Sequence, residues 1–397
     1  MTHEPSTKIS ICIVGDAFAD IFCFLNKPTS HSKKGEVVPM GGCVLVDQPL
    51  QTMPGGSGIN TSTHLCSLLQ DFVDKKSLDG LISSNWDIQL QTVLNPKDEH
   101  GTLLLDHAKK YNLPIINCHP DYCFNDSQNQ ENQNKTSPNH SSTPHVIVIV
   151  SPGERSFIAH LGCIAHFQAH QIDTQKLINS HDDVGIYPNN QSHHLHIHIA
   201  GYYNIQGFWN NALKQELKRV KTERSKLGPS YTTTISLTPQ YDSLQEWDGG
   251  ILSLLEYIDF LILSEDEAEG ITTIKKKEWR KMAEHFYAYS PNTVAIVTLG
   301  AEGVIALSNG EVIHEEKSNV VDHVVDATGA GDAFAAGFVF GFLKGQYEEN
   351  YDDKRSNIDN IKKGMRWGCA TGAACVKVAG ASVPASKYEI EHFLCIK

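Results

Sequence analysis

The sequence predicts an α/β fold with three layers, in which a central, mostly parallel β-sheet lies between two layers of helices. The main observation is that short apolar runs alternate with longer helical stretches. Strands that are separated by helices form parallel sheets covered on both faces. A second observation is size, because 397 residues allow one large α/β domain as well as two or three ordinary domains.

The elements follow one another in a regular order. Strands are expected at Ile9–Val14, Ile88–Val93, His145–Val150, Leu195–Ala200, Thr232–Leu237, Asp259–Leu263 and Thr293–Thr298. Helices are expected at Gly207–Lys221, Trp247–Glu256 and Trp279–Tyr289. The last third differs, because Gly329–Lys344 and Asn357–Val378 are helical, rich in small residues and have no strand between them.

Composition excludes several classes of function. Lys and Arg number 33 against 46 Asp and Glu, so the net charge is −13 and neither a nucleic-acid nor an anionic membrane surface is expected. No stretch approaches the roughly 18 apolar residues of a membrane span, and the N-terminus lacks a signal-peptide core, so we expect a soluble cytoplasmic protein. The 10 cysteines include no C-x-x-C pair, which disfavours a zinc knuckle or a redox dithiol.

A polar segment at about residues 124–144 does not fit a compact domain. It is rich in Asn, Gln and Ser and has almost no apolar residue from Asn125 onward. Such a segment cannot bury enough surface to offset its ordering entropy, so we expect a disordered insertion between two sheet elements. A smaller polar insertion is expected at His181–His193.

The most informative stretch is Val324–Phe334, which reads VVDATGAGDAF. Gly329 and Gly331 let the backbone expose successive N–H groups at the start of a long apolar helix, where they and the helix dipole form an anion site. Asp332 lies in the first turn of that helix. A carboxylate beside an anion site can take a proton from a hydroxyl that attacks a phosphate, so Asp332 is a candidate general base. The alternative is a carboxylate that only stabilises the helix N-terminus.

The same stretch resembles the C-terminal signature of the PfkB/ribokinase family of carbohydrate kinases. Further segments resemble elements of this family and occur in the family's order: Gly15–Asp20 (GDAFAD), Pro54–Asn60 (PGGSGIN), Asn95–Gly101 (NPKDEHG), Gly153–Phe157 (GERSF) and Thr298–Gly303 (TLGAEG). The resemblance implies a ribokinase-like kinase domain over residues 8–397. It also implies a small β lid, formed by segments after the first strand and near Leu113–Gly162.

The resemblance implies a reaction and roles for individual residues. The reaction would be transfer of the γ-phosphate of ATP, with Mg²⁺, to a hydroxyl of a small sugar. Asp332 would be the general base, and the N–H groups of Gly329, Ala330 and Gly331 would hold the charge of the transferring phosphate. The substrate would be bound by Asp20, Gly55, Gly56 and Asn60. The nucleotide would be bound by Thr298, Gly300 and Gly303.

Two segments depart from the family pattern. The N-x-x-E element, which organises magnesium through water, reads Ser264-Glu265-Asp266-Glu267, so Glu267 matches while serine replaces the asparagine. Serine lacks the two donors of an amide. Asp326 and Thr328 match one side of the family's monovalent-cation site. The loop Gly380–Pro384 is shorter than the loop that completes this site, so dependence on K⁺ stays open.

Several alternatives stay open at this point. A nucleoside kinase of the same fold would carry the same motifs, and a catalytically silent member would act as a regulatory binding partner. Ser264 favours the silent member, whereas the intact Gly329–Asp332 stretch argues against it. The chain is expected to be a monomer or a lid-mediated homodimer. No P-loop motif and no serine-hydrolase elbow occurs, so neither of those enzyme classes is expected.

Three histidines form an unusual pattern. His194, His196 and His198 alternate along one strand, so they share one face of it. They could bind zinc, or they could form a partly polar face near the carboxyl end of the strand.

Overall fold

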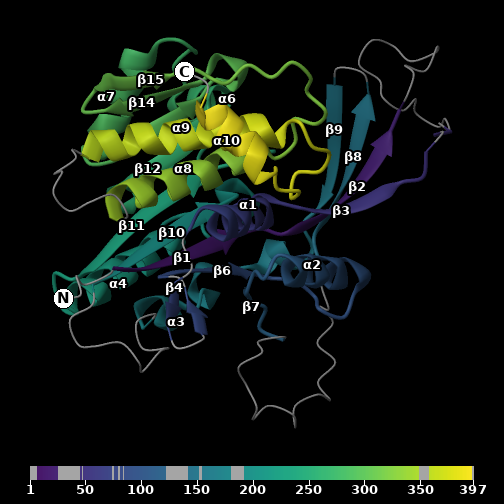
Figure 1. The fold of residues 1–397 in the computed structure, drawn as a ribbon, viewed down its shortest axis with the longest axis horizontal. Helices are drawn as coiled ribbons and strands as arrows, with labels where there is room; N and C mark the ends of the chain where they lie inside the picture. Colours follow the sequence, from purple (N-terminus) through teal and green to yellow (C-terminus); the bar gives the residue numbers. More distant parts are fainter. Residues whose placement is uncertain are drawn as a thin grey trace, which may run out of the picture.

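The computed structural model describes residues 7–25, 45–46, 48–73, 76–78, 81–83, 85–121, 142–151, 154–179, 192–347 and 357–395. Its centre is a nine-stranded sheet in the order β15-β14-β13-β12-β11-β10-β1-β6-β7 (Figure 1). The strands from β13 to β7 pair in parallel, whereas β14 and β15 add an antiparallel edge. The predicted mostly parallel sheet is therefore confirmed.

The strands of this sheet have the following bounds: β1 (Lys8–Gly15), β6 (Trp86–Thr92), β7 (Ile115–Asn117), β10 (His193–Ala200), β11 (Tyr231–Thr238), β12 (Phe260–Ser264), β13 (Val294–Thr298), β14 (Val304–Ser308) and β15 (Glu311–Glu316). A separate two-stranded hairpin consists of β4 (Lys76–Leu78) and β5 (Leu81–Ser83).

Helices cover both faces of the large sheet, which confirms the three layers. One apolar core contains Ile11 of β1 and side chains of α1 (Ser57–Phe72), α2 (Glu99–Lys110), α8 (Ala330–Tyr347), α9 (Asn357–Cys375) and α10 (Lys387–Cys395). The second core contains Ile197 of β10 and side chains of α3 (Thr174–Ile178), α4 (Ala212–Lys226), α5 (Ile251–Leu254), α6 (Glu265–Thr272) and α7 (Trp279–Tyr289). Short 3₁₀ helices are η2 (Gly162–His166), η3 (Ala169–Gln171), η4 (Tyr202–Asn204), η5 (Leu255–Tyr257) and η6 (Gly300–Glu302).

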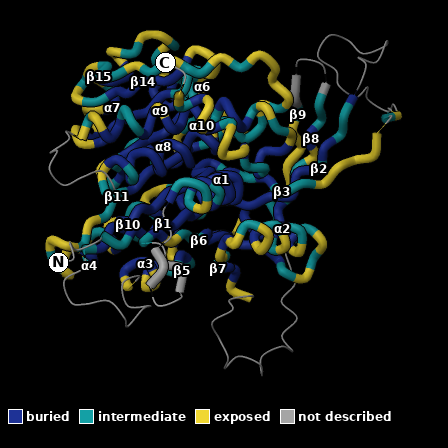
Figure 2. The backbone as a smooth tube through the Cα atoms, viewed as in Figure 1, coloured by how far each residue is buried: buried dark blue, intermediate teal, exposed yellow. Residues whose placement is uncertain are grey.

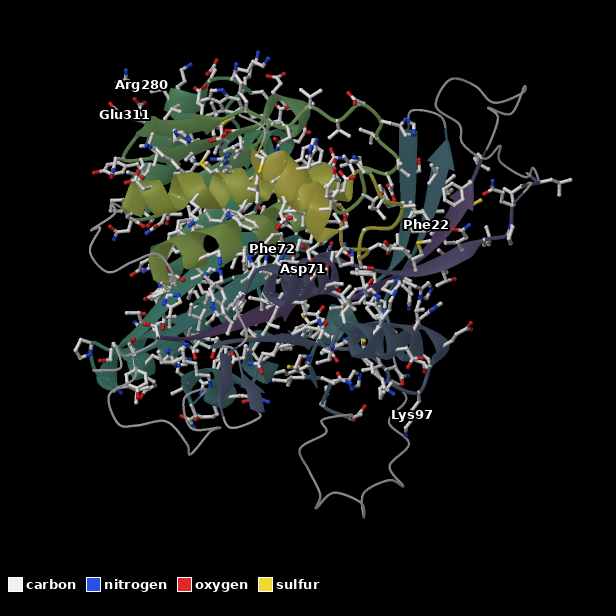
Figure 3. All side chains as sticks on the ribbon, in the orientation of Figure 1. Phe22, Asp71, Phe72, Lys97, Arg280 and Glu311 are labelled. Atoms are coloured by element: carbon white, nitrogen blue, oxygen red, sulfur yellow. The ribbon has the colours of Figure 1, made fainter. Side chains whose placement is uncertain are left out.

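A second sheet projects from one end of the molecule (Figure 1). Its order is β3-β2-β8-β9, with bounds β2 (Phe18–Phe24), β3 (Gln51–Gly55), β8 (His145–Ser151) and β9 (Glu154–His160). Figure 3 labels Phe22 on this sheet, far from Arg280 on α7 and Glu311 on β15. The four strands come from the two regions in which the resemblance implies a lid, and we call this sheet the lid sheet.

Helix α8 lies in the interior, as Figure 2 shows by its dark blue tube. Its Phe334, Phe338 and Phe342 are buried, and two glycines let α9 approach closely. A Cβ on Gly337 would lie 2.6 Å from the Trp367 carbonyl oxygen, and one on Gly341 would lie 2.7 Å from the Trp367 side chain. This packing fixes the axis of α8 and therefore the position of its N-terminal turn.

Two helices are shorter than expected, and several strands were not predicted. The helix expected at Gly207–Lys221 begins only at Ala212, because Asn210 and Asn211 have positive φ angles of 52° and 72°. The helix expected at Trp247–Glu256 is reduced to α5 and η5, since Trp247 also has a positive φ of 54°. The strands β2, β3, β4, β5, β7, β14 and β15 were not predicted. β4, β5 and β7 have only three residues each, and β3 and β15 contain no continuous apolar run.

The expected insertion at 124–144 lies outside the described residues, except for its last three residues. These three residues lie in the described part of the chain and lead into β8. Thr143 is fully buried, its N–H donates to Asp98 Oδ2 at 2.7 Å, and its hydroxyl accepts from the Asn95 N–H at 3.0 Å. The expected insertion at His181–His193 lies outside the described residues apart from its last two. None of the helices in the described ranges is long and apolar enough to cross a membrane.

Candidate active site

The carboxyl ends of the parallel strands meet at one edge of the large sheet. The first strand, β1, lies between β6 on one side and β10 on the other, which is the point where strand order reverses. In open α/β sheets, ligands bind in the crevice outside the strand ends at such a point. Asp16 follows β1, Gln240 follows β11, and Ser264 and Thr298 end β12 and β13.

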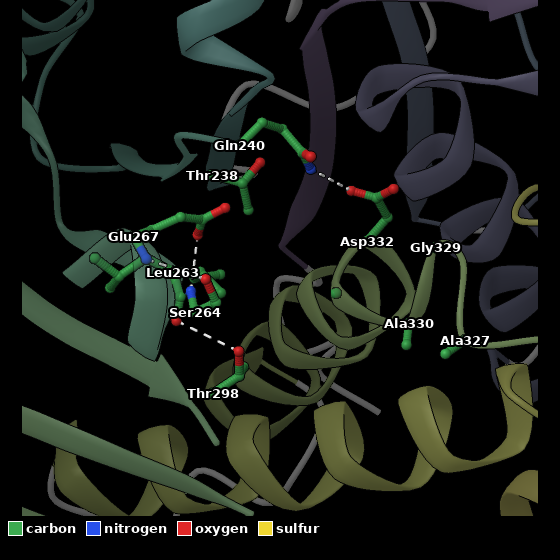
Figure 4. A pocket seen from close by; sticks show the side chains of 12 residues that line it. Thr238, Gln240, Leu263, Ser264, Glu267, Thr298, Ala327, Gly329, Ala330 and Asp332 are labelled. Atoms are coloured by element: carbon green, nitrogen blue, oxygen red, sulfur yellow. Dashed lines mark hydrogen bonds between the residues drawn. The ribbon is translucent and has the colours of Figure 1, made fainter. Parts of the chain in front are cut away.

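A pocket of about 180 Å³ lies at this edge (Figure 4). Ser264, Glu267 and Thr298 lie on one side of it, and the N-terminal turn of α8 lies on the other. The pocket brings together many residues singled out in the sequence, namely Ser264, Glu267, Thr298, Gly329, Ala330, Gly331 and Asp332. It also contains Thr238 and Gln240, which were not predicted.

Asp332 is the most strongly constrained side chain of the pocket. It is only 6% exposed, and its Oδ1 accepts hydrogen bonds from Ser57 Oγ at 2.7 Å and from Gln240 Nε2 at 3.0 Å. Its Oδ2 accepts from Asn60 Nδ2 at 2.9 Å. Burial raises the pKa of Asp332, and the hydrogen bonds from Asn60, Ser57 and Gln240 partly oppose this. The result is a desolvated carboxylate in a fixed orientation.

Glycines shape the start of α8. Gly329 has a φ of 78°, and a Cβ there would lie 2.7 Å from the Ala381 side chain. A Cβ on Gly331 would meet no atom within 4 Å, so this glycine borders open space in the pocket. The first N–H groups of a helix have no partner within the helix, and together with the helix dipole they attract anions.

Asp20 on the lid sheet joins the same cluster of acids. It is 6% exposed, and burial raises its pKa to about 7, with further contributions from the charges of Asp16 and Asp332. A Cβ on Gly55 would lie 2.1 Å from Asp20 Oδ2, so a larger residue there would displace this carboxylate. Gly56 has a φ of 94° and begins α1. The structure therefore brings Asp20, Gly55 and Gly56 together.

Two further groups complete this side of the site. Asn60 Oδ1 is buried and has no hydrogen-bond partner among the described residues, so it is an acceptor without a donor. Asp16 is fully buried and accepts from the Gly58 N–H at 3.1 Å and from Asn204 Nδ2 at 2.6 Å. Burial raises the pKa of Asp16 to about 7. Its hydrogen bonds orient α1, whereas the Asp20 carboxylate accepts none within the described ranges.

Ser264 and Glu267 engage each other. Glu267 Oε2 accepts from the Ser264 N–H at 2.8 Å, and Ser264 Oγ accepts from the Glu267 N–H at 3.3 Å, which is a capping box at the start of α6. Burial raises the pKa of Glu267 to about 7. The S-x-x-E pattern is the sequence signal of such a cap. The serine that replaces the family's asparagine thus has a local structural role.

The oxygen donors present fit a water-rich magnesium site better than a direct protein cage. Within the described ranges, no group of three His, Cys, Asp or Glu side chains could hold a metal ion directly. Mg²⁺ usually keeps several waters and is bound by one or two carboxylates together with substrate phosphates. Glu267, which lines the pocket, matches that donor chemistry.

Asp326 connects the two loops that correspond to the family's monovalent-cation site. Its Oδ1 accepts from the Thr328 N–H at 2.9 Å, and its Oδ2 accepts from the Gly380 N–H at 3.1 Å. The loop before α8 and the Gly380–Pro384 loop are therefore held side by side.

The segment expected to bind the nucleotide is only partly in the pocket. Thr298 lines it, and its hydroxyl donates to the Leu263 carbonyl at 3.4 Å. Gly300 and Gly303 follow in the turn around η6 and do not line this pocket. They have φ angles of 57° and 118°, and a Cβ on Gly303 would lie 2.1 Å from the Glu316 carbonyl oxygen. Their presence is thus explained by turn geometry.

The three alternating histidines are buried and bonded to hydroxyl groups of β11. His196 Nδ1 lies 2.8 Å from Thr234 Oγ1, and its Nε2 lies 2.9 Å from Ser236 Oγ. The zinc alternative is not supported, since the described residues include no group that could hold a metal ion. The face is polar, as the other alternative expected, but it begins at the second residue of β10 and is not confined to its carboxyl end.

Ser57 and Gln240 were missed as partners of Asp332. Ser57 lies inside the PGGSGIN segment, so the motif could have drawn attention to it. Gln240 belongs to no motif. Its side chain reaches Asp332 from a residue whose own backbone has a φ of 62°, which the sequence does not indicate.

Comparison with known proteins agrees with this arrangement. The model of the pfkB family of carbohydrate kinases matches residues 132–387. ATP-dependent 6-phosphofructokinase from Thermoanaerobacterium thermosaccharolyticum is 32% identical over 159 residues, which are 38% of this chain and 44% of that protein. Adenosine kinase from Schizosaccharomyces pombe is 28% identical over 144 residues, which are 34% of this chain and 38% of that protein. The matched region thus spans less than half of each relative.

Among solved structures, Arabidopsis thaliana ribokinase complexed with ribose and ATP superimposes with a TM-score of 0.61 at 17% identity, over 99% of each chain. This likeness shows a shared ribokinase-type fold, with its large sheet between helices and its smaller second sheet. Because the family model matches more than half of the sequence and the fold agrees over nearly its whole length, the chain belongs to the pfkB family of carbohydrate kinases.

Proposed function

We propose that residues 8–397 form one kinase domain that transfers the γ-phosphate of ATP to a hydroxyl of a small sugar. The observation that carries the proposal is the environment of Asp332. Its carboxylate is buried in the first turn of α8, beside a glycine-rich helix start that faces open space. Relatives of the chain include proteins named ATP-dependent 6-phosphofructokinase and ribokinase.

Asp332 is the general base in this proposal. Its Oδ1 already accepts two hydrogen bonds, whereas Oδ2 accepts one from Asn60 within the described residues, so Oδ2 is open to a substrate hydroxyl. The hydroxyl oxygen forms a bond to the γ-phosphorus as its proton moves to Oδ2, and the bond from that phosphorus to the bridging oxygen breaks to give ADP. The raised pKa of Asp332 makes it a stronger base.

The start of α8 stabilises the charge that develops on the phosphate. The N–H groups of Gly329, Ala330 and Gly331 are the proposed donors. Such preorganised donors can each contribute about 3–4 kcal/mol in other transfer reactions. The empty space beside Gly331 supports close approach of a phosphate, because no side chain blocks the backbone there.

Glu267, with Ser264, would hold Mg²⁺ through water, and Asp326 with Thr328 would hold a monovalent cation such as K⁺. When bound, Mg²⁺ neutralises phosphate charge. The chain's own contribution is to fix the Glu267 carboxylate through its hydrogen bond to the Ser264 N–H.

The sugar would lie between the lid sheet and α1, in contact with Asp20, Gly55, Gly56 and Asn60. The unpartnered Asn60 Oδ1 supports this assignment, since a sugar hydroxyl would supply its missing donor. The nucleotide would be bound by Thr298, Gly300 and Gly303.

The lid sheet also bears on assembly. Phe157 and Ile158 on β9 are 59% and 60% exposed, and such apolar side chains on an outer strand favour a lid-mediated homodimer over a monomer. Light scattering of the full chain would distinguish the two.

A nucleoside kinase is the second candidate, because adenosine kinase is among the relatives. The test is ADP formation from ATP and Mg²⁺ across a panel of sugars and nucleosides. Turnover with a sugar supports the main proposal, and turnover only with a nucleoside supports the second candidate. Binding without turnover of any panel member would instead favour a regulatory binding protein.

A further inference from the structure

A regular array of hydrogen bonds connects β10 with β11 beneath α8. The strands pair in parallel with His194 beside Thr232, His196 beside Thr234 and His198 beside Ser236. Each ring bridges two hydroxyls of β11. Five of the six distances from ring nitrogen to oxygen are between 2.7 and 2.9 Å, and the sixth, from His198 Nε2 to Thr238 Oγ1, is 3.5 Å. We call this array the histidine–hydroxyl ladder. It consists of His194, His196, His198, Thr232, Thr234 and Ser236.

The ladder leads to the candidate base. At its inner end, His198 Nε2 lies 3.5 Å from Thr238 Oγ1, which lies 3.4 Å from Ser57 Oγ, and Ser57 donates to Asp332. At its outer end, His194 Nδ1 lies 2.8 Å from the Tyr347 hydroxyl. Asp332 lies in the first turn of α8, and Tyr347 is its last residue. The helix that carries the base therefore extends from one end of the ladder to the other (Figure 1). The two contacts at Thr238 are the longest.

The rings are neutral, which restricts the direction of every hydrogen bond. Burial lowers the pKa of His194 and of His198 to about 3 and that of His196 well below its ordinary value. A neutral imidazole has one N–H and one acceptor nitrogen, and a hydroxyl has one hydrogen. Each hydroxyl between two rings therefore donates to one ring and accepts from the other.

The ionised state of Asp332 then determines the direction of each hydrogen bond along the ladder. An ionised Asp332 can only accept, so Ser57 donates to it and is free to accept from Thr238. The single hydrogen of the Thr238 hydroxyl has two acceptors within reach, Ser57 Oγ at 3.4 Å and the Ile199 carbonyl oxygen at 3.5 Å. With either acceptor, Thr238 accepts from the Nε2–H of His198, whose Nδ1 accepts from Ser236. The same alternation gives His196 and His194 the Nε2–H tautomer. All the hydrogens then point along the ladder towards Asp332.

Aligned neutral dipoles act on a charge as the N-terminus of a helix does. Among the described residues, the titratable groups that interact with the charge of Asp332 are three acids and a thiol, namely Asp16 after β1, Asp20 on β2, Glu267 on α6 and Cys375 on α9. α1 and the loop after β11 present the neutral donors Ser57, Asn60 and Gln240. A set of dipoles directed at Asp332 would favour its ionised, base-competent form.

We propose that the histidine–hydroxyl ladder is a positioning device for the base, in which His196 and His198 hold Ser57 as a donor to an ionised Asp332. This inference rests on the proposed function, in which Asp332 accepts the substrate proton. It assigns a role in the reaction to side chains that do not touch the substrate.

The test compares His196→Gln with His193→Gln in the full chain. Glutamine cannot bridge two hydroxyls as the ring of His196 does. His193 is an equally buried histidine of the same strand that contacts Ser10 and Arg224 outside the ladder. The readout is kcat against pH at saturating ATP and sugar. We expect the acid midpoint to rise by about 0.2–0.7 pH units in His196→Gln, as for loss of a helix-dipole interaction, and to stay in place in His193→Gln.

The outcomes separate the ladder from the proposed function. An unmoved midpoint in a folded His196→Gln variant, with Asp332→Asn inactive, overturns the ladder proposal alone. Full activity of Asp332→Asn overturns the proposed function. If His196→Gln does not fold, nitrogen NMR of the labelled wild-type chain decides: Nε2–H tautomers at His194, His196 and His198 support the ladder, and an Nδ1–H tautomer at any of them overturns it.

Discussion

Ser57 and Asp332 are 275 positions apart in the sequence, yet Ser57 Oγ donates a 2.7 Å hydrogen bond to Asp332 Oδ1. The bond joins the N-terminal turns of α1 and α8, which also meet through Asn60. The candidate sugar-binding segment and the candidate base are thus connected directly. Changes in either helix start are expected to act on both.

Gly331→Ala should impair the candidate active site and leave the fold intact. A Cβ at this position meets no protein atom within 4 Å, so the variant should fold, and alanine in a helix is favoured over glycine by about 0.5–1 kcal/mol. The added methyl would occupy space beside the proposed phosphate donors. We expect an unchanged or higher melting temperature and a kcat lower by at least tenfold. Wild-type kcat would show that this space is not used by the phosphate.

Ser264 allows two matched substitutions. Ser264→Asn keeps a side chain suited to the N-cap and adds amide donors, so the Mg²⁺ concentration for half-maximal rate should fall. Ser264→Ala removes the cap of α6 and should lower the free energy of unfolding by about 1 kcal/mol. A raised Mg²⁺ requirement in Ser264→Asn would mean that serine is the better residue for this site.

Ionisation of Asp20 should lower the stability of the folded state at neutral pH. Its pKa is raised from about 4 in an unfolded chain to about 7, so the folded state binds the proton more tightly and its stability falls as pH rises through this window. Asp20→Asn cannot ionise. Its melting temperature, relative to wild type, should therefore increase from pH 5 to pH 8.

The same variant should lose sugar affinity, which is read as a higher KM for the sugar. A difference in melting temperature that does not change with pH would contradict the raised pKa of Asp20. An unchanged KM would contradict its place in the sugar site.

Substitution of Thr143 tests whether the C-terminal end of the polar segment packs against the domain. It is buried and bonds to Asn95 and Asp98, so Thr143→Ala should lower the free energy of unfolding by about 1–3 kcal/mol. Ser142 contacts the exposed His160 ring and offers a neighbouring control that should change stability little. Equal effects of the two substitutions would indicate that Thr143 is not an anchor.

Much of the fold could be predicted because buried parallel strands are continuous apolar runs, as in β1, β12 and β13. Of the lid strands, β8 was expected from its apolar run, whereas β3 was not, since Gln51–Gly55 contains a proline and has no continuous apolar run. Asp332 could be identified from its place in a glycine-rich helix start, and Asn60 because the segment around it resembles a motif of the family.

Contacts set by tertiary structure could not be predicted. Gln240 reaches Asp332 only because β11 ends beside α8 and the backbone takes a positive φ. The histidine–hydroxyl ladder depends in the same way on the register of β10 with β11, which the sequence of either strand alone does not specify.

The central claim is that Asp332 removes the proton from the substrate hydroxyl, and Asp332→Asn tests it most directly. Asparagine keeps the shape and is tolerated near helix starts, so the variant should fold. Asp359→Asn, in the first turn of α9, is the matched control and should keep wild-type kcat. General-base contributions are about 10²–10⁴-fold, and we expect a loss of kcat in that range with ATP affinity retained. A folded Asp332→Asn variant that keeps more than about a tenth of wild-type kcat would contradict the account.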